Sequence, residues 1–142
     1  MLTTKDLMIG DIITFKDSVQ TDEIPIPIKV IALGYQHSDD ENEALVQIGN
    51  DKTCDIVTID EEFVGYPLTA EILEKNGFRK LETYGTEKWL CDNLRLNVYS
   101  SDGTWRFCAD TNRNENSVIY IRFVHELQNA IRICGIEKEI VI

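Results

Sequence analysis

An amphipathic stretch near the end of the chain constrains the fold more than any other feature. Apolar residues recur there at the helical spacing i, i+3, i+7 and i+10, at Val124, Leu127, Ile131 and Cys134. A one-sided stripe of this kind predicts a helix over about 123–134 that buries its apolar face. Gly135 supplies the residue type that commonly follows a helix. The apolar segment 136–142 then predicts a short closing strand.

The segment before this helix carries an antiparallel pattern. Residues 94–98 alternate between apolar and polar, and residues 105–107 alternate in return. Between them, Asp102 and Gly103 form a dipeptide typical of two-residue hairpin turns. A third strand is predicted at 118–123, after a polar loop at 110–116. Together these features predict an antiparallel β-meander of three strands.

Short strands also dominate the first half of the chain. They are predicted at 13–15, from 28 onward, at 44–48 and at 54–59, with an extended stretch at 63–64. Pro25 and Pro27 cannot donate ladder hydrogen bonds, so pairing of the second strand is expected to begin only near Ile28. Strands this short and closely spaced predict a small curled antiparallel sheet or an SH3-like barrel.

The two halves are joined without an obvious linker. A helix is predicted to begin after Thr69 as N-cap and to stop at Gly77. The preceding segment 64–68 is too short and apolar for a flexible linker. The length of 142 residues is common for one domain. We therefore expect an α+β fold with one compact domain, residues 1–142, composed of a β-rich subregion 1–66 and an α+β subregion 67–142.

Negative charge is concentrated in the first subregion. The chain holds 14 Lys and Arg against 25 Asp and Glu, a net charge of −11. Residues 1–66 contain 4 Lys and 14 Asp or Glu, whereas residues 67–142 contain 10 basic and 11 acidic residues. Because no run of Lys and Arg forms along the sequence, we expect no direct binding of nucleic acid. The acidic loop 37–43 is expected to be a solvated turn.

Three segments resemble a known protein family. They read LMIGDI at 7–12, PLTAEILEKNGF at 67–78 and FVHELQNA at 123–130. In this order they resemble the LRIGN, PLTEEWL..FGF and YVHQLQNLYFALTG blocks of short uncharacterised proteins from Bacteroidetes genomes and their phages or mobile elements. The chain departs from the pattern at Glu126, where Gln is usual, and at 130–132, where an aromatic-rich run is usual. The resemblance implies a cellular setting and no catalytic residue.

Polar residues of the last helix form the candidate interaction face. The face consists of His125, Glu126, Gln128 and Asn129. His125 and Asn129 stand four residues apart and therefore share one side of a helix. A zinc-protease motif would need a second His at position 129, so that motif is absent.

The remaining chemistry of the sequence indicates no cofactor. The cysteines are far apart and are expected to be reduced, structural thiols: Cys54, Cys91, Cys108 and Cys134. No phosphate loop, dinucleotide fingerprint or metal-ligand spacing occurs. No apolar run approaches the ~18 residues of a membrane span, and the start lacks a secretory leader pattern. We therefore expect a cytoplasmic protein without a membrane partner.

Three hypotheses of function follow. The first is a non-enzymatic accessory or interaction domain of a phage or mobile element, which binds a protein partner through the polar face of the last helix. The second is an inhibitor whose acidic first subregion mimics nucleic acid and occupies a basic site on another protein. The third is a small hydrolase that uses His125 with a thiol or carboxylate brought near by the fold.

Overall fold

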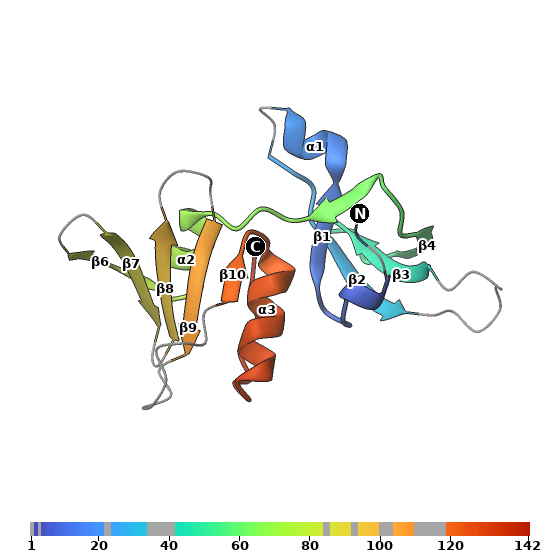
Figure 1. Ribbon diagram of the computed structural model, residues 1–142. Coiled ribbons are helices and arrows are strands. Elements are labelled where there is room, and N and C mark those ends of the chain that lie inside the picture. The colour runs from blue at the N-terminus through green and yellow to red at the C-terminus, as the bar shows by residue number, and fades with distance from the viewer. Residues whose placement is uncertain are drawn as a thin grey trace. The chain divides into compact units, whose positions relative to one another are not determined.

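The structure, a computed structural model, divides into two compact units, Met1–Pro67 and Leu68–Ile142 (Figure 1). It describes residues 2, 4–21, 24–33, 42–83, 86–91, 94–99, 104–109 and 119–142. The boundary between the units falls one residue after the boundary that the sequence predicts between its subregions. That the chain forms one domain stays a prediction, which the unfolding of the variant Leu127→Asp would test.

The first unit contains a five-stranded antiparallel sheet. Its strands are β1 (Ile12–Phe15), β2 (Ile28–Leu33), β3 (Glu43–Ile48), β4 (Cys54–Thr58) and β5 (Phe63–Gly65). They confirm the predicted strands, and their order in the sheet is β4-β3-β2-β1-β5. Within the described strands β4 and β5 are the two edges, so the sheet is open and not a closed barrel. Two short helices, η1 (Thr4–Asp6) and α1 (Lys16–Gln20), were not predicted.

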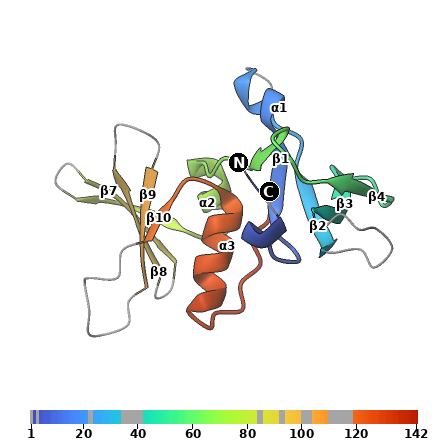
Figure 2. The same ribbon diagram turned by 45° about the vertical axis from the view of Figure 1, so that its right-hand side comes forward.

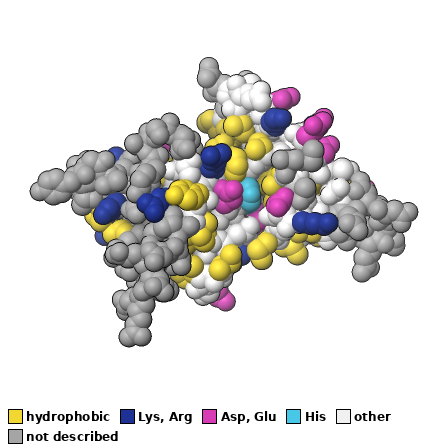
Figure 3. Space-filling view, in the orientation of Figure 1, with side chains coloured by type: hydrophobic (Ala, Val, Ile, Leu, Met, Phe, Trp, Pro, Cys, Tyr) yellow, Lys and Arg dark blue, Asp and Glu magenta, His cyan; other side chains and the backbone are white. Residues whose placement is uncertain are grey.

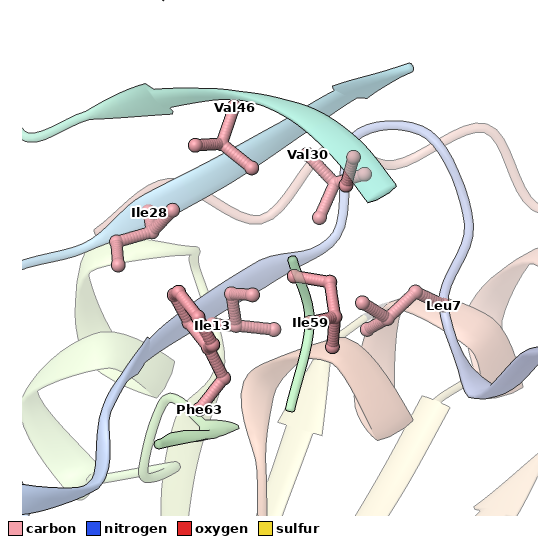
Figure 4. Close-up of a cluster of buried hydrophobic side chains, with 8 residues drawn as sticks. Leu7, Ile13, Ile28, Val30, Val46, Ile59 and Phe63 are labelled. Carbon is pink, nitrogen blue, oxygen red and sulfur yellow. The ribbon is translucent and has the colours of Figure 1, made fainter. Parts of the chain in front are cut away.

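Alternating apolar residues on these strands build the core of the first unit (Figure 4). Ile28 and Val30 of β2 are completely buried, and Ile13 of β1 lies with them. Thr14 is also completely buried, and its hydroxyl donates a hydrogen bond to the Ile26 carbonyl oxygen at 2.8 Å. That bond offsets the cost of removing a hydroxyl from water. It also ties β1 to the proline-containing segment before β2.

The second unit contains another five-stranded antiparallel sheet, two strands larger than the predicted meander. Its strands are β6 (Arg79–Thr83), β7 (Thr86–Cys91), β8 (Leu94–Tyr99), β9 (Thr104–Ala109) and β10 (Ile119–Ile121), in the order β10-β9-β8-β7-β6. Strands β6 and β7 were not predicted because each contains charged residues at consecutive positions, Arg79 and Lys80 in β6 and Glu87 and Lys88 in β7, which hides the period of two. The predicted hairpin turn at residues 102 and 103 and the loop at 110–116 lie outside the described residues.

One face of this second sheet carries the buried aromatic residues. Trp89 is 1% exposed and Phe107 is 1% exposed, and both belong to one row of cross-strand partners. The rings of Trp89 and Trp105 meet edge to face with centroids 6.5 Å apart. Trp105 Nε1 donates a hydrogen bond to the Leu68 carbonyl oxygen at 3.2 Å. Figures 1 and 2 show α2 (Ala70–Lys75) and α3 (Val124–Ile133) on the same side of this sheet.

Helix α3 confirms the predicted amphipathic helix. Val124, Leu127 and Ile131 are completely buried, as the stripe requires. Cys134, the fourth member of the predicted stripe, is instead exposed. The reason is that the helix ends at Ile133, and Cys134 is its C-cap, followed by Gly135 in the left-handed region at φ +71°. A residue beyond the last helical turn no longer follows the period of the stripe.

The predicted closing strand over residues 136–142 is wrong. No strand forms in this segment, although Ile140 is 2% exposed. The backbone of Val141 is paired with a side chain: Asn76 Nδ2 donates to the Val141 carbonyl oxygen at 2.7 Å, and the Val141 N–H donates to Asn76 Oδ1 at 2.8 Å. The amide of Asn76 thus supplies the donor and the acceptor that a neighbouring strand would otherwise supply.

Helix α2 begins as the sequence predicts. Thr69 is its N-cap, and the Thr69 hydroxyl oxygen accepts the Ile72 N–H at 3.4 Å. Gly77 follows the helix in the left-handed region, at φ +81°. The N–H of Glu71 and the hydroxyl of Thr69 donate to the Glu71 carboxylate and hold its pKa below the ordinary value. The ionised carboxylate therefore stabilises the start of α2.

We expect Glu71→Gln to change how stability depends on pH. The folded-state pKa of Glu71 is lowered, so its contribution is present above the unfolded-state pKa of about 4.3 and is lost as the pH falls through the folded value. In thermal melts from pH 7 to pH 3, the variant should start slightly less stable than the parent and converge with it in acid. Glu74→Gln, an exposed position of the same helix, is the control. If the difference in melting temperature between the parent and Glu71→Gln stayed the same from pH 7 to pH 3, this role of Glu71 would be contradicted.

Candidate functional site

Two of the four residues of the predicted interaction face are buried in α3. His125 is 5% exposed and Gln128 is 3% exposed. The imidazole of His125 stacks on the ring of Phe123, with centroids 5.8 Å apart and planes inclined by 10°. His125 and Gln128 are therefore part of the packed interior and not of the surface. The hypothesis of a hydrolase that uses His125 stays a prediction.

The other two residues of that face make local contacts of α3. Glu126 Oε2 accepts the Arg122 N–H at 2.7 Å and the Phe123 N–H at 3.1 Å, which caps the start of the helix. A Gln at this position would retain an acceptor for the same bonds. Asn129 Oδ1 accepts a hydrogen bond from Arg132 Nη1 at 3.0 Å. The role of the four residues as an interaction face stays a prediction.

The thiols are not gathered into a site in the described part of the chain. Cys91 is buried, with its Sγ 4.0 Å from the Asn76 carbonyl oxygen, whereas Cys54 and Cys134 are exposed. The side chain of Cys108 and residues 37–41 of the acidic loop, including His37, lie outside what the structure describes. Among the described residues, no three His, Cys, Asp or Glu side chains are grouped closely enough to hold a metal ion.

The face of the second sheet opposite the buried tryptophans forms a second candidate site. The cross-strand register pairs Arg79 with Leu90, Leu81 with Lys88, and Arg106 with Tyr120. Partners in register point to the same side of a sheet, and residues two apart on a strand do so as well. We call this surface the outer face, and its described members are Arg79, Leu81, Lys88, Leu90, Thr104, Arg106, Tyr120 and Arg122.

The outer face is positively charged. Four of its eight described members are Arg or Lys. On β8, Arg95 is the register partner of Leu90, and Asn97 is the register partner of Lys88 and Arg106. None of the strand positions in these rows is an Asp or Glu. The two acidic residues of the strands, Glu82 and Glu87, are cross-strand partners in a different row of the register.

A tyrosine stands among these cations at the β10 edge of the sheet. Tyr120 is 64% exposed. The Arg106 guanidinium carbon lies 6.0 Å from the centroid of its ring, within the range of a cation–π interaction. Arg122 is exposed, and its Nε donates to Thr104 Oγ1 at 3.3 Å. In Figure 3, dark blue Lys and Arg side chains appear at the left, over the second unit.

Sequence reasoning missed this surface because its residues are dispersed. The cations of the outer face are separated by 9, 18 and 16 positions along the chain, so no basic run appears. We expected no direct binding of nucleic acid because the sequence contains no such run. The available signal was weak: Arg106 in β9 and Arg122, directly after β10, each stand between two apolar residues in the sequence. The register of the strands is needed to show that these residues lie side by side on one surface.

The chain has no match among models of known protein families, curated proteins or solved structures. Within the described residues, no helix is both long and apolar enough to cross a membrane.

Proposed function

We propose that the chain is a non-enzymatic binding module that engages a negatively charged partner through the outer face. The observation that carries this proposal is the set of four cations, with no Asp or Glu among the described members of the outer face. The resemblance of three sequence segments to proteins of phages and mobile elements supports an accessory role in that setting. A binding module of this kind needs no cofactor.

The net charge of −11 does not prevent such binding. Salt limits the reach of each charge to a Debye length of about 8 Å at physiological ionic strength. A partner in contact with the outer face therefore interacts most strongly with the charges that it touches there, Arg79, Lys88, Arg106 and Arg122. The acidic excess belongs to the other unit, since residues 1–66 hold 14 of the 25 acidic residues and 4 of the 14 basic ones.

The exposure of the two edges of the outer face also favours binding. An antiparallel sheet commonly packs one face on its core and leaves the other to solvent. Here the solvent side carries Leu81, which is 41% exposed, and Tyr120, beside the cations. Cations interleaved with exposed apolar groups offer both electrostatic attraction and contact area to a partner.

Chromatography on immobilised heparin, a sulfated polyanion, tests the proposal. At pH 7 and low salt the parent protein should be retained despite its net charge, and Arg79→Gln with Lys88→Gln should elute at clearly lower salt. The matched control is Lys75→Gln with Lys138→Gln, which changes the net charge equally, at positions outside the outer face. Failure of the parent to bind, or the same shift in both double variants, would show that the outer face is not the binding surface.

A further inference from the structure

We infer that the ligand of the outer face is a single-stranded nucleic acid, with Tyr120 stacking on a base while Arg79, Lys88 and Arg122 contact phosphates. This inference rests on the proposed function, because it specifies the chemical class of the negatively charged partner. It applies to single-stranded DNA and RNA alike, since both present stacked bases on a chain of phosphates.

The exposed ring distinguishes a nucleic acid from an acidic protein surface. Carboxylates of a protein partner would pair with the cations but would not need an aromatic platform. Proteins that bind single strands combine a positively charged surface with aromatic side chains on which bases stack. Tyr120 is 64% exposed, and Arg106 adds a cation 6.0 Å from its ring centroid. These are the two components of such a platform, on neighbouring strands.

The cations are spaced to follow a strand across the sheet. Arg79 lies on β6 and Arg122 directly follows β10, at opposite edges, with Lys88 on β7 and Arg106 on β9 between them. Four strand spacings of about 4.8 Å give a width of roughly 19 Å, enough for several nucleotides. Arg122 donates one guanidinium N–H to Thr104. Because a guanidinium has five N–H donors, this bond does not prevent Arg122 from contacting a phosphate as well.

The shape of the outer face favours a single strand over a duplex. Sequence readers of double-stranded DNA insert a helix or a two-stranded ribbon into the major groove. Both helices of the second unit, α2 and α3, lie on the opposite side of the sheet (Figures 1 and 2). A sheet face with exposed aromatic groups instead suits bases that are splayed out of a helix.

Fluorescence anisotropy with labelled 20-nucleotide oligothymidine and oligouridine, titrated with the full chain, tests the inference. We expect saturable binding that weakens as salt is raised from 50 to 200 mM. Each lost phosphate contact reduces the slope of log K against log salt by about 0.7, so Arg79→Gln with Lys88→Gln should reduce it by about 1.4 and weaken binding roughly 25-fold at 0.1 M salt. Lys75→Gln with Lys138→Gln should leave both quantities unchanged.

Substitution of Tyr120 tests the contribution of stacking to affinity separately from electrostatic attraction. Tyr120→Leu should weaken binding about tenfold with an unchanged salt slope, because it removes a stacking surface and no charge. Tyr120→Phe keeps the ring and should bind nearly as the parent does. Circular dichroism melts check that each variant is folded, which is expected because Tyr120 is largely exposed.

The outcomes separate the two proposals. Retention on heparin without binding to either oligonucleotide would overturn the inference and leave the proposed function intact. Equal competition by polyglutamate and oligothymidine, tighter binding of a 20-base-pair duplex, or no effect of Tyr120→Leu would also overturn it. Loss of all polyanion binding would overturn both.

Discussion

Leu127→Asp is expected to abolish the folded state of the second unit. Leu127 is completely buried at the centre of the stripe on α3. Removing the bulk of a buried Leu alone costs about 2–5 kcal/mol. An unpaired carboxylate in the same place adds several kcal/mol more. The sum is comparable to the whole stability of a typical domain, about 5–15 kcal/mol.

Tryptophan fluorescence measures this effect directly. The only tryptophans of the chain, Trp89 and Trp105, are buried in the second unit. Their emission should shift to the red in Leu127→Asp, and the thermal transition should disappear. The control is Ile133→Asp on the same helix, where the parent side chain is 80% exposed, and this variant should remain folded. A retained folded transition in Leu127→Asp would mean that the stripe is an interface and not core.

The same variant tests whether the two units unfold together. Units of 67 and 75 residues each bury only about 60% of the surface of their unfolded chains, so each is marginally stable alone. We therefore expect the methyl resonances of Ile13 and Val30 in the first unit to lose their dispersion in Leu127→Asp as well. Native methyl signals beside unfolded tryptophans would instead show two independent domains, contrary to the single domain that the sequence predicts.

Asn76→Ala is expected to destabilise the fold by about 2 kcal/mol. Asn76 is 8% exposed, and its amide bonds to the Ile72 carbonyl oxygen and to both backbone groups of Val141, 65 residues away. Leaving a buried backbone group without its partner costs about 1–3 kcal/mol, and water reaches Val141 partly, because its side chain is 53% exposed. Urea denaturation followed by tryptophan fluorescence measures the change.

A double-mutant cycle isolates the contact between Asn76 and the end of the chain. Removing residues 141 and 142 should cost a similar free energy in the parent and almost nothing further in Asn76→Ala. Asn76→Asp keeps the shape and the acceptor for the Val141 N–H but loses both donations from Nδ2, so it should be destabilised as well. Strictly additive effects of the truncation and Asn76→Ala would show that the side chain does not hold the C-terminal segment.

Local patterns identified most of the elements from the sequence. The alternation around Ile13 and Ile28 and the stripe through Val124 and Leu127 record which side of an element is buried. That information lies within a few neighbouring residues, because a strand repeats every two residues and a helix every 3.6. Turn and cap signals at Thr69 and Gly77 work over the same short range. These features of the fold could therefore be predicted from the sequence.

Tertiary structure decided the features that join distant residues. The charged segments at β6 and β7 become strands only because the rest of the meander pairs with them. The C-terminal segment finds its partner in a side chain, Asn76, that no strand pattern indicates. The outer face is assembled from one or two residues on each of β6, β7, β9 and β10, since register sets which side chains become neighbours. By itself the sequence determined most of the elements and which of their sides are buried, whereas pairing between strands determined which charges form a surface.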